Sequence, residues 1–178
     1  YRGDKARGLV VVNHLARRGR RLGADVYAEA RSHVPLDLIG MGSDESPGGI
    51  GEIQHDRLPA FAAGYRFMFN PIRYTSLGLA VCEAMLLGMP IVGLATTEMA
   101  STIEHGKSGY VHTDVNVLID GMRHLIAHPA EATRMGEAAR AVARERFGIE
   151  RFARDWLQTF AWVANRSLNV RVASHGLT

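Results

Sequence analysis

Short apolar runs alternate with helical stretches along most of this chain of 178 residues, and this alternation constrains its fold more than any other feature. Each run is mostly apolar and does not alternate with polar residues over its length, as expected of strands that are covered on both faces of a parallel sheet. We expect four such strands, over 36–39, 65–69, 90–94 and 109–112. Helices are expected over 5–18, 25–33, 58–64, 76–87, 99–104, 114–127, 129–147 and 149–165. The pattern therefore predicts an α/β fold, a parallel sheet with helices on both faces.

The beginning of the chain departs from that pattern. The first expected helix, Lys5–Arg18, follows the capping residue Asp4 and has apolar residues at helical spacing, among them Leu9 and Val12. Because a parallel α/β sheet normally begins with a strand, we expect that a first strand, and a preceding domain, are missing. Residues 1–165 would then form one domain and residues 166–178 a tail.

The composition excludes several classes of protein. A single cysteine, Cys82, cannot form an internal disulfide bond or a CxxC zinc site. No apolar run approaches the ~20 residues that a membrane-spanning helix needs. The formal net charge of +3 rests almost entirely on arginine, which is suited to binding phosphate, although arginine-rich codon usage would explain the same composition.

The segment Arg73–Pro90 holds the most informative candidate residues. Glu83 is the charged residue of an otherwise apolar helix, which is expected to be buried, so its carboxylate needs hydrogen-bond donors. A vicinal diol offers two such donors. The free N–H groups at Leu77 and Gly78, where the helix begins, could bind a phosphate, and Gly78 has no Cβ to keep it away. Alternatively, Glu83 pairs with a core arginine or faces a hydrated notch.

The sequence SLGLAVCEAMLLGMPIVG at residues 76–93 resembles the signature of the group 1 (family 4) glycosyltransferases. The matching positions are Gly78, Leu79, Glu83, Ala84, Met85, Gly88 and Pro90. The similarity continues through residues 103–109 and 145–147, and Arg7-Gly8 stands where the family usually has Lys-Gly. It spans about residues 5–165 and implies a Rossmann-like domain, the carboxy-terminal half of a two-domain GT-B enzyme.

The resemblance implies a role for each matched position. Glu83 would bind the ribose of a nucleotide-sugar donor, and the backbone at Gly78 and Leu79 would contact its diphosphate. Arg7 would neutralise phosphate charge as the nucleotide leaves, unless it is a solvated residue of a flexible loop. No cofactor and no metal ion are expected, because the donor is a substrate of UDP or GDP type.

Two departures from the family pattern bear on catalysis. Thr75 replaces the family's first glutamate, which touches the transferred sugar in relatives, and Thr97-Glu98 replaces a Gly-Gly pair. Glu98 either supplies a carboxylate near the sugar or starts a short helix. Arg73 either reaches the same site or caps a surface turn. Thr75 and Glu98 are therefore the candidate catalytic residues, and Arg73 is a candidate binding residue.

The expected function is retaining, metal-independent transfer of a sugar to an acceptor that a missing amino-terminal domain holds. By itself the chain is expected to bind a nucleotide diphosphate weakly and to transfer nothing. The alternative is an inactive module of the same fold that binds a nucleotide, a sugar or a partner protein. The expected location is the cytoplasm, with peripheral membrane contact as an open alternative.

Other motifs carry weaker signals. Gly40-Met41-Gly42 follows a strand without a third glycine and is expected to be a turn, within a loop over residues 40–54. His124 and His128 have metal-ligand spacing but no third ligand, and His55-Asp56 is expected to cap a helix. The arginine cluster at 17–21 could meet nucleic acid or an anionic membrane, but it lacks interleaved aromatic residues. It is expected to be a solvated helix end, so no nucleic-acid partner is predicted.

Overall fold

The computed structural model describes residues 1–175, with side chains described through residue 165. The chain divides into two compact units, Tyr1–Ala143 and Arg144–Thr178. The first unit contains the sheet, and the second contains the end of α7 (Pro129–Phe147) together with α8 (Ile149–His175). All residues of the candidate site belong to the first unit.

Six parallel strands form the sheet, in the order β3-β2-β1-β4-β5-β6. They are β1 (Lys5–Val11), β2 (Leu36–Ile39), β3 (Gly49–Gly51), β4 (Tyr65–Asn70), β5 (Ile91–Leu94) and β6 (Gly109–His112). The strand order changes direction between β1 and β4, which pair through Leu9 and Met68. Ligands of open parallel sheets bind beyond the carboxyl ends of the strands at such a point.

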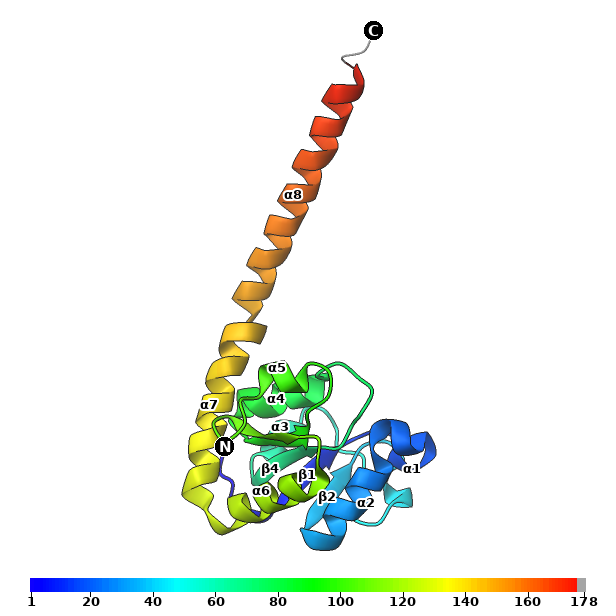
Figure 1. Ribbon diagram of the computed structural model, residues 1–178, viewed down its shortest axis with the longest axis vertical. Coiled ribbons are helices and arrows are strands. Elements are labelled where there is room, and N and C mark those ends of the chain that lie inside the picture. The colour runs from blue at the N-terminus through cyan, green and yellow to red at the C-terminus, as the bar shows by residue number, and fades with distance from the viewer. Residues whose placement is uncertain (176–178) are drawn as a thin grey trace. The chain divides into compact units, whose positions relative to one another are not determined.

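Helices cover both faces of the sheet, as predicted. Figure 1 shows α3, α4 and α5 on one side of the sheet, and α2 and α6 on the other. The helices of the first unit before α7 are α1 (Leu15–Arg18), α2 (Ala24–His33), α3 (Leu58–Ala62), α4 (Leu79–Leu87), α5 (Met99–Thr102) and α6 (Val115–Ala127). Two short 3-10 helices, Gly19–Leu22 and Ser43–Glu45, lie in the connections.

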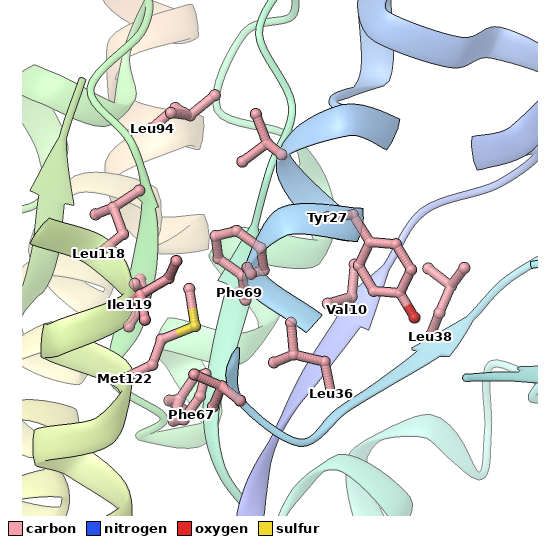
Figure 2. Close-up of a cluster of buried hydrophobic side chains, with 14 of the residues drawn as sticks. Val10, Tyr27, Leu36, Leu38, Phe67, Phe69, Leu94, Leu118, Ile119 and Met122 are labelled. Atoms are coloured by element: carbon pink, nitrogen blue, oxygen red, sulfur yellow. The ribbon is translucent and has the colours of Figure 1, made fainter. Parts of the chain in front are cut away.

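Each face of the sheet has its own hydrophobic core. Val10 and Phe67 point toward α2 and α6, where they pack against residues such as Met122 (Figure 2). The neighbouring residues Leu9 and Met68 belong to the other core, which α3, α4 and α7 cover. Because successive side chains of a strand point to opposite faces, both faces of these central strands must be apolar. This accounts for the apolar runs at residues 9–11 of β1 and 67–69 of β4.

The expected helix over Lys5–Arg18 is wrong, because residues 5–11 form β1 and the helix is limited to α1. The expectation of a missing first strand rested on that helix, and β1 removes this reason for it. Burial decides the conformation: Leu9 and Val10 are covered on opposite faces, which suits a strand and not a helix with one apolar side. Gly8 is required here, because a Cβ at this position would lie 2.3 Å from the Phe67 ring.

The expected loop over residues 40–54 contains a short edge strand, β3. Leu38 pairs with Gly49 and Ile39 with Gly51, so the glycine-rich segment completes the sheet at one edge. Its sequence, Gly-Ile-Gly, has neither the apolar run nor the alternation by which strands are predicted. The other four expected strands are confirmed to within a residue at each end.

Arg66 lies on β4, a strand whose six residues are all buried. Its guanidinium group donates hydrogen bonds to the carbonyl oxygens of Gly3 (2.6 Å), Leu125 (3.1 Å) and Ile126 (2.7 Å). The last two carbonyls belong to the final turn of α6, where helical carbonyls have no partner within the helix. A buried arginine therefore joins β4 to the end of α6 and to the start of the chain.

In the second unit, α8 continues to His175, past the expected end of the helix at Asn165. Most of the expected tail over 166–178 is therefore helical, and its last three residues lie outside the described residues. Aromatic rings follow one another along the helix, with ring centroids of Trp156 and Phe160 5.3 Å apart. No helix within residues 1–175 is long and apolar enough to span a membrane.

Candidate functional site

Hydrogen bonds join the loops that follow the strands at the carboxyl edge of the sheet. The side-chain oxygen of Asn13, after β1, accepts a hydrogen bond of 2.9 Å from the backbone N–H of Met41, after β2. On the other side of β4, the hydroxyl of Thr97 donates to the carbonyl oxygen of Thr75 at 2.5 Å. These contacts lie on the two sides of the point where the strand order changes direction.

Two residues at this edge have strained backbones. His14 (φ 53°) and Thr97 (φ 47°) are the non-glycine residues with positive φ in the described part of the chain. They follow β1 and β5, at the carboxyl ends of the strands. Left-handed conformations of non-glycine residues cost free energy and are concentrated at functional sites, so their position agrees with a functional site at this edge of the sheet.

The amino-terminal end of α4 is open to an incoming group. Gly78 caps the helix with φ 84° and ψ 141°, and no side chain accepts a hydrogen bond from the first turn. No atom lies within 4 Å of the place that a Cβ of Gly78 would take. The backbone N–H groups of the first turn are thus available, and the helix dipole favours an anion at this end.

Glu83 lies one turn further along α4, and the helix is not buried on all sides as expected. Val81 and Met85 pack onto the sheet, whereas Leu79 is 80% exposed and the Glu83 side chain is 45% exposed. Leu79 and Glu83 are four residues apart and therefore share the exposed face of the helix. The carboxylate therefore needs no buried donor. Of the two alternatives given above for Glu83, pairing with a core arginine or facing a hydrated notch, the structure agrees better with the notch.

His55 is a residue of this site that the sequence did not reveal. Its Nε2 atom lies 3.3 Å from Oε1 of Glu83. The expected cap by His55 and Asp56 is wrong, because α3 begins after Arg57 without any side-chain cap. No spacing pattern connects positions 55 and 83, since only the packing of α3 against α4 brings them together.

Arg73 is held at the border of the site by α2. Its guanidinium group donates two hydrogen bonds, of 2.5 and 2.9 Å, to the carboxylate of Asp25, in the first turn of α2. A third goes to the carbonyl oxygen of Arg20 at 3.2 Å. The hydrogen bond from Arg73 is the main reason why the pKa of Asp25 lies below its usual value. Arg73 thus fixes the β4–α4 loop to α2.

The two candidate catalytic residues lie on loops that touch each other. Thr75 is half-buried, and its carbonyl oxygen is the acceptor for Thr97. Glu98 is exposed, stands at the N-cap position of α5 and accepts a hydrogen bond of 3.1 Å from the Ser101 hydroxyl. Of the two alternatives for Glu98, this geometry favours the helix start.

The structure does not bring Arg7 to this edge. Arg7 lies in β1, four residues before its carboxyl end, which corresponds to about 13 Å along a strand. It is not in a flexible loop, because its guanidinium group pairs with Asp37 at 2.7 Å. The other carboxylate oxygen of Asp37 accepts a hydrogen bond from the Tyr65 hydroxyl. Burial, together with this bond, raises the pKa of Tyr65.

The remaining candidate motifs are structural where the structure describes them. Gly40-Met41-Gly42 forms a turn, as predicted, in which Ser43 N–H donates to the Gly40 carbonyl oxygen. A Cβ at Gly40 would lie 2.7 Å from the side-chain oxygen of Asn13, so glycine permits the two loops to approach. Within the described residues, no three His, Cys, Asp or Glu side chains are placed to hold a metal ion.

The sheet order, its coverage by helices on both faces and the open start of α4 define a Rossmann-like domain of the GT-B type. The family model described as glycosyl transferases group 1 matches residues 31–128, more than half of the chain. The chain belongs to this family.

Individual relatives agree with this assignment. Trehalose synthase of Thermococcus litoralis is 27% identical over 75% of this chain and 38% of its own length. The chain thus spans less than half of this curated relative. A mutant of TarM from S. aureus, solved with Fondaparinux, alpha-GlcNAc-glycerol and UDP, has a TM-score of 0.74 and 17% identity, over 90% of this chain and 36% of that one.

A third similar structure is a domain on its own. It is the C-terminal domain of a group 1 glycosyl transferase, LpcC, from Francisella tularensis. It has a TM-score of 0.63 and 12% identity, and the match covers 80% of this chain and 87% of that one. At these identities both solved structures show a shared fold.

Proposed function

We propose that this chain is the carboxy-terminal, nucleotide-sugar-binding domain of a glycosyltransferase and that it binds a donor of UDP or GDP type. The observation that carries the proposal is the exposed face of α4, which presents free N–H groups at Gly78 and Leu79 and the carboxylate of Glu83 one turn later. Four residues of helix separate the two groups by about 6 Å. A nucleoside diphosphate offers an anionic group and a ribose diol that can occupy them together.

The charges at the two positions match those of the ligand. The diphosphate would accept hydrogen bonds from the uncapped first turn, where the helix dipole is favourable. The ribose hydroxyls would donate to the Glu83 carboxylate, which accepts at both oxygens. Gly78 leaves room for the phosphate, because no atom surrounds its missing Cβ.

The transfer step would use the same groups. As the bond between the sugar and the diphosphate breaks, its electron pair passes to the departing nucleotide, and N–H donors fixed in advance stabilise that charge. No metal is required in this scheme, and retention of anomeric configuration is part of the proposal. Thr75 would lie beside the sugar in place of the family glutamate, with Glu98 on the adjoining loop. Arg7 is left out of the proposed site because of its position in β1.

The acceptor would be held by another domain, so the chain alone is proposed to bind the nucleotide weakly and to transfer nothing. Calorimetry with UDP, GDP and ADP tests the binding. The proposed ribose contact is removed from the protein side by Glu83→Gln, which replaces the carboxylate, and from the ligand side by 2′-deoxy-UDP, which lacks a ribose hydroxyl. We expect each change to weaken UDP binding about tenfold or more, as removing a hydrogen bond to a charged group does. Glu137→Gln, which changes an exposed glutamate of α7, is the matched control.

A module that binds without catalysing is the second candidate, and Thr75 favours it because the position lacks a carboxylate that could stabilise positive charge on the sugar. Absence of binding by any of the three nucleotides, or equal binding by Glu83→Gln, would favour a protein-interaction module. Sugar transfer by the isolated chain would contradict the proposed division between domains.

A further inference from the structure

A cavity lies beside α4, on the side of the helix that faces α3. It has a volume of about 320 Å³, with β1 and β4 as its floor. Its polar lining residues are His55, Glu83 and Arg140, and every other lining side chain is apolar. Binding sites for small molecules have volumes of about 300–1,000 Å³ and mostly apolar walls, so the cavity is large enough to hold a ligand.

Small residues keep this space open. α3 has five residues, and it faces α4 through Ala62, while α4 contributes Ala80 and Ala84. Ala62 and Ala84 are each 7% exposed, which places them inside the hydrophobic core and not on the surface. The core on this side of the sheet is therefore incomplete between the two helices, although larger apolar side chains would fill it.

The charged groups of the cavity differ in their partners. Glu83 already has His55 beside it, at 3.3 Å. Arg140 of α7 forms no hydrogen bond or ion pair within the described residues, and its Cδ lies 3.8 Å from where a Cβ of Gly88 would be. Since Gly88 ends α4, the unpaired cation lies toward the carboxy-terminal end of that helix. It is an available partner for an anion.

We propose that this cavity binds a single-chain amphiphile, an alkyl chain of about ten carbons with an anionic head group that pairs with Arg140. A cavity of about 150 Å³ holds one benzene molecule, so 320 Å³ accommodates about twice as many carbon atoms. A sugar or a phosphate in the interior would lose its hydrogen bonds to water without gaining partners, because the walls are apolar. The cavity shares Glu83 and His55 with the proposed nucleotide site, whereas its interior and Arg140 are separate from the first turn of α4.

The test is calorimetry of the whole chain with decyl phosphate, decanoate and decanol below their micelle concentrations. We expect one molecule of each to bind. Ala62→Leu fills the cavity from α3, so we expect about tenfold weaker binding of all three, with no fall in the melting temperature. Arg140→Gln should weaken the two anions about tenfold and leave decanol unchanged. Tighter binding of decyl phosphate would indicate a phosphorylated lipid as the natural ligand, and tighter binding of decanoate would indicate a fatty acid.

Two controls keep the test sharp. Ala63→Leu changes the adjacent alanine, which is equally buried but does not line the cavity, so it should lower the melting temperature and leave the affinity unchanged. Decanol carries no charge that could interact with Glu83 or Arg140, so its binding reports on the apolar interior of the cavity alone. Failure of UDP to bind, with decanol still bound, therefore leaves this proposal intact. The proposed cavity site would be overturned if none of the three amphiphiles bound, if several molecules bound per chain, or if Ala62→Leu left binding unchanged. If Arg140→Gln bound the anions as tightly as the original chain, the proposed pairing of an anionic head group with Arg140 would be wrong.

Discussion

His55 Nε2 lies 3.3 Å from Glu83 Oε1, so the segment before α3 holds one oxygen of the carboxylate on the exposed face of α4. The second oxygen of Glu83 has no such partner within the described residues. A hydrogen bond to one oxygen limits the rotation of the carboxylate and leaves acceptor positions for a ligand. His55 is therefore a positioning residue of the proposed ribose site.

His55→Ala tests this role. We expect UDP binding to weaken about threefold, since an exposed charged contact contributes up to about 1 kcal/mol. The loss should vanish in the Glu83→Gln background, because the histidine acts through that carboxylate. Calorimetry on the four proteins of this double-mutant cycle measures the effect. An equal loss in both backgrounds would show that His55 contacts the nucleotide directly.

Thr97→Gly is expected to show how much strain the β5–α5 loop holds. Glycine adopts the φ of 47° freely, which favours the variant by about 1–2 kcal/mol. Loss of the hydrogen bond to Thr75 opposes this by about 1 kcal/mol. Urea unfolding should give an unchanged or slightly raised free energy. Thr97→Ser retains the hydroxyl and serves as the control, and a clear loss of stability in Thr97→Gly would contradict the strain.

The Arg73–Asp25 pair predicts a dependence of stability on pH. Because the pKa of Asp25 is lowered in the folded chain, its contribution is fully present above the unfolded pKa near 4 and is lost as pH falls through the folded pKa. Both side chains are partly exposed, so the contribution is about 1 kcal/mol or less. Unfolding of the original chain and of Asp25→Asn should therefore differ at pH 7, and the difference should shrink as pH falls below about 4 and vanish only below the lowered pKa of folded Asp25. A constant difference across this range would contradict the assignment.

Arg66→Met is expected to destabilise the first unit by about 3 kcal/mol, because three carbonyl oxygens lose their donor in a buried setting. Arg123→Met, at an exposed position of α6, should change stability by less than about 0.5 kcal/mol. Urea denaturation of the two variants measures the difference. Similar stabilities for both would show that water replaces the arginine.

Much of this fold follows from local sequence. The strands at 36–39, 65–70, 91–94 and 109–112 are mostly apolar, and short runs of this kind predict buried strands. The glycines and apolar residues around Glu83 likewise place it on a helix with an open start. These features depend on residues close together in the chain, so the sequence alone determined them.

The tertiary structure decided the rest. The spacing of the apolar residues after Asp4 suits a helix, but Lys5–Val11 becomes a strand because β2 and β4 hydrogen-bond to both of its edges. Glu83 is exposed because its helix turns only one side to the sheet, and His55 reaches it across the packing of α3 against α4. Such relationships join residues far apart in the sequence, and their free energies arise only when the sheet and its helices assemble.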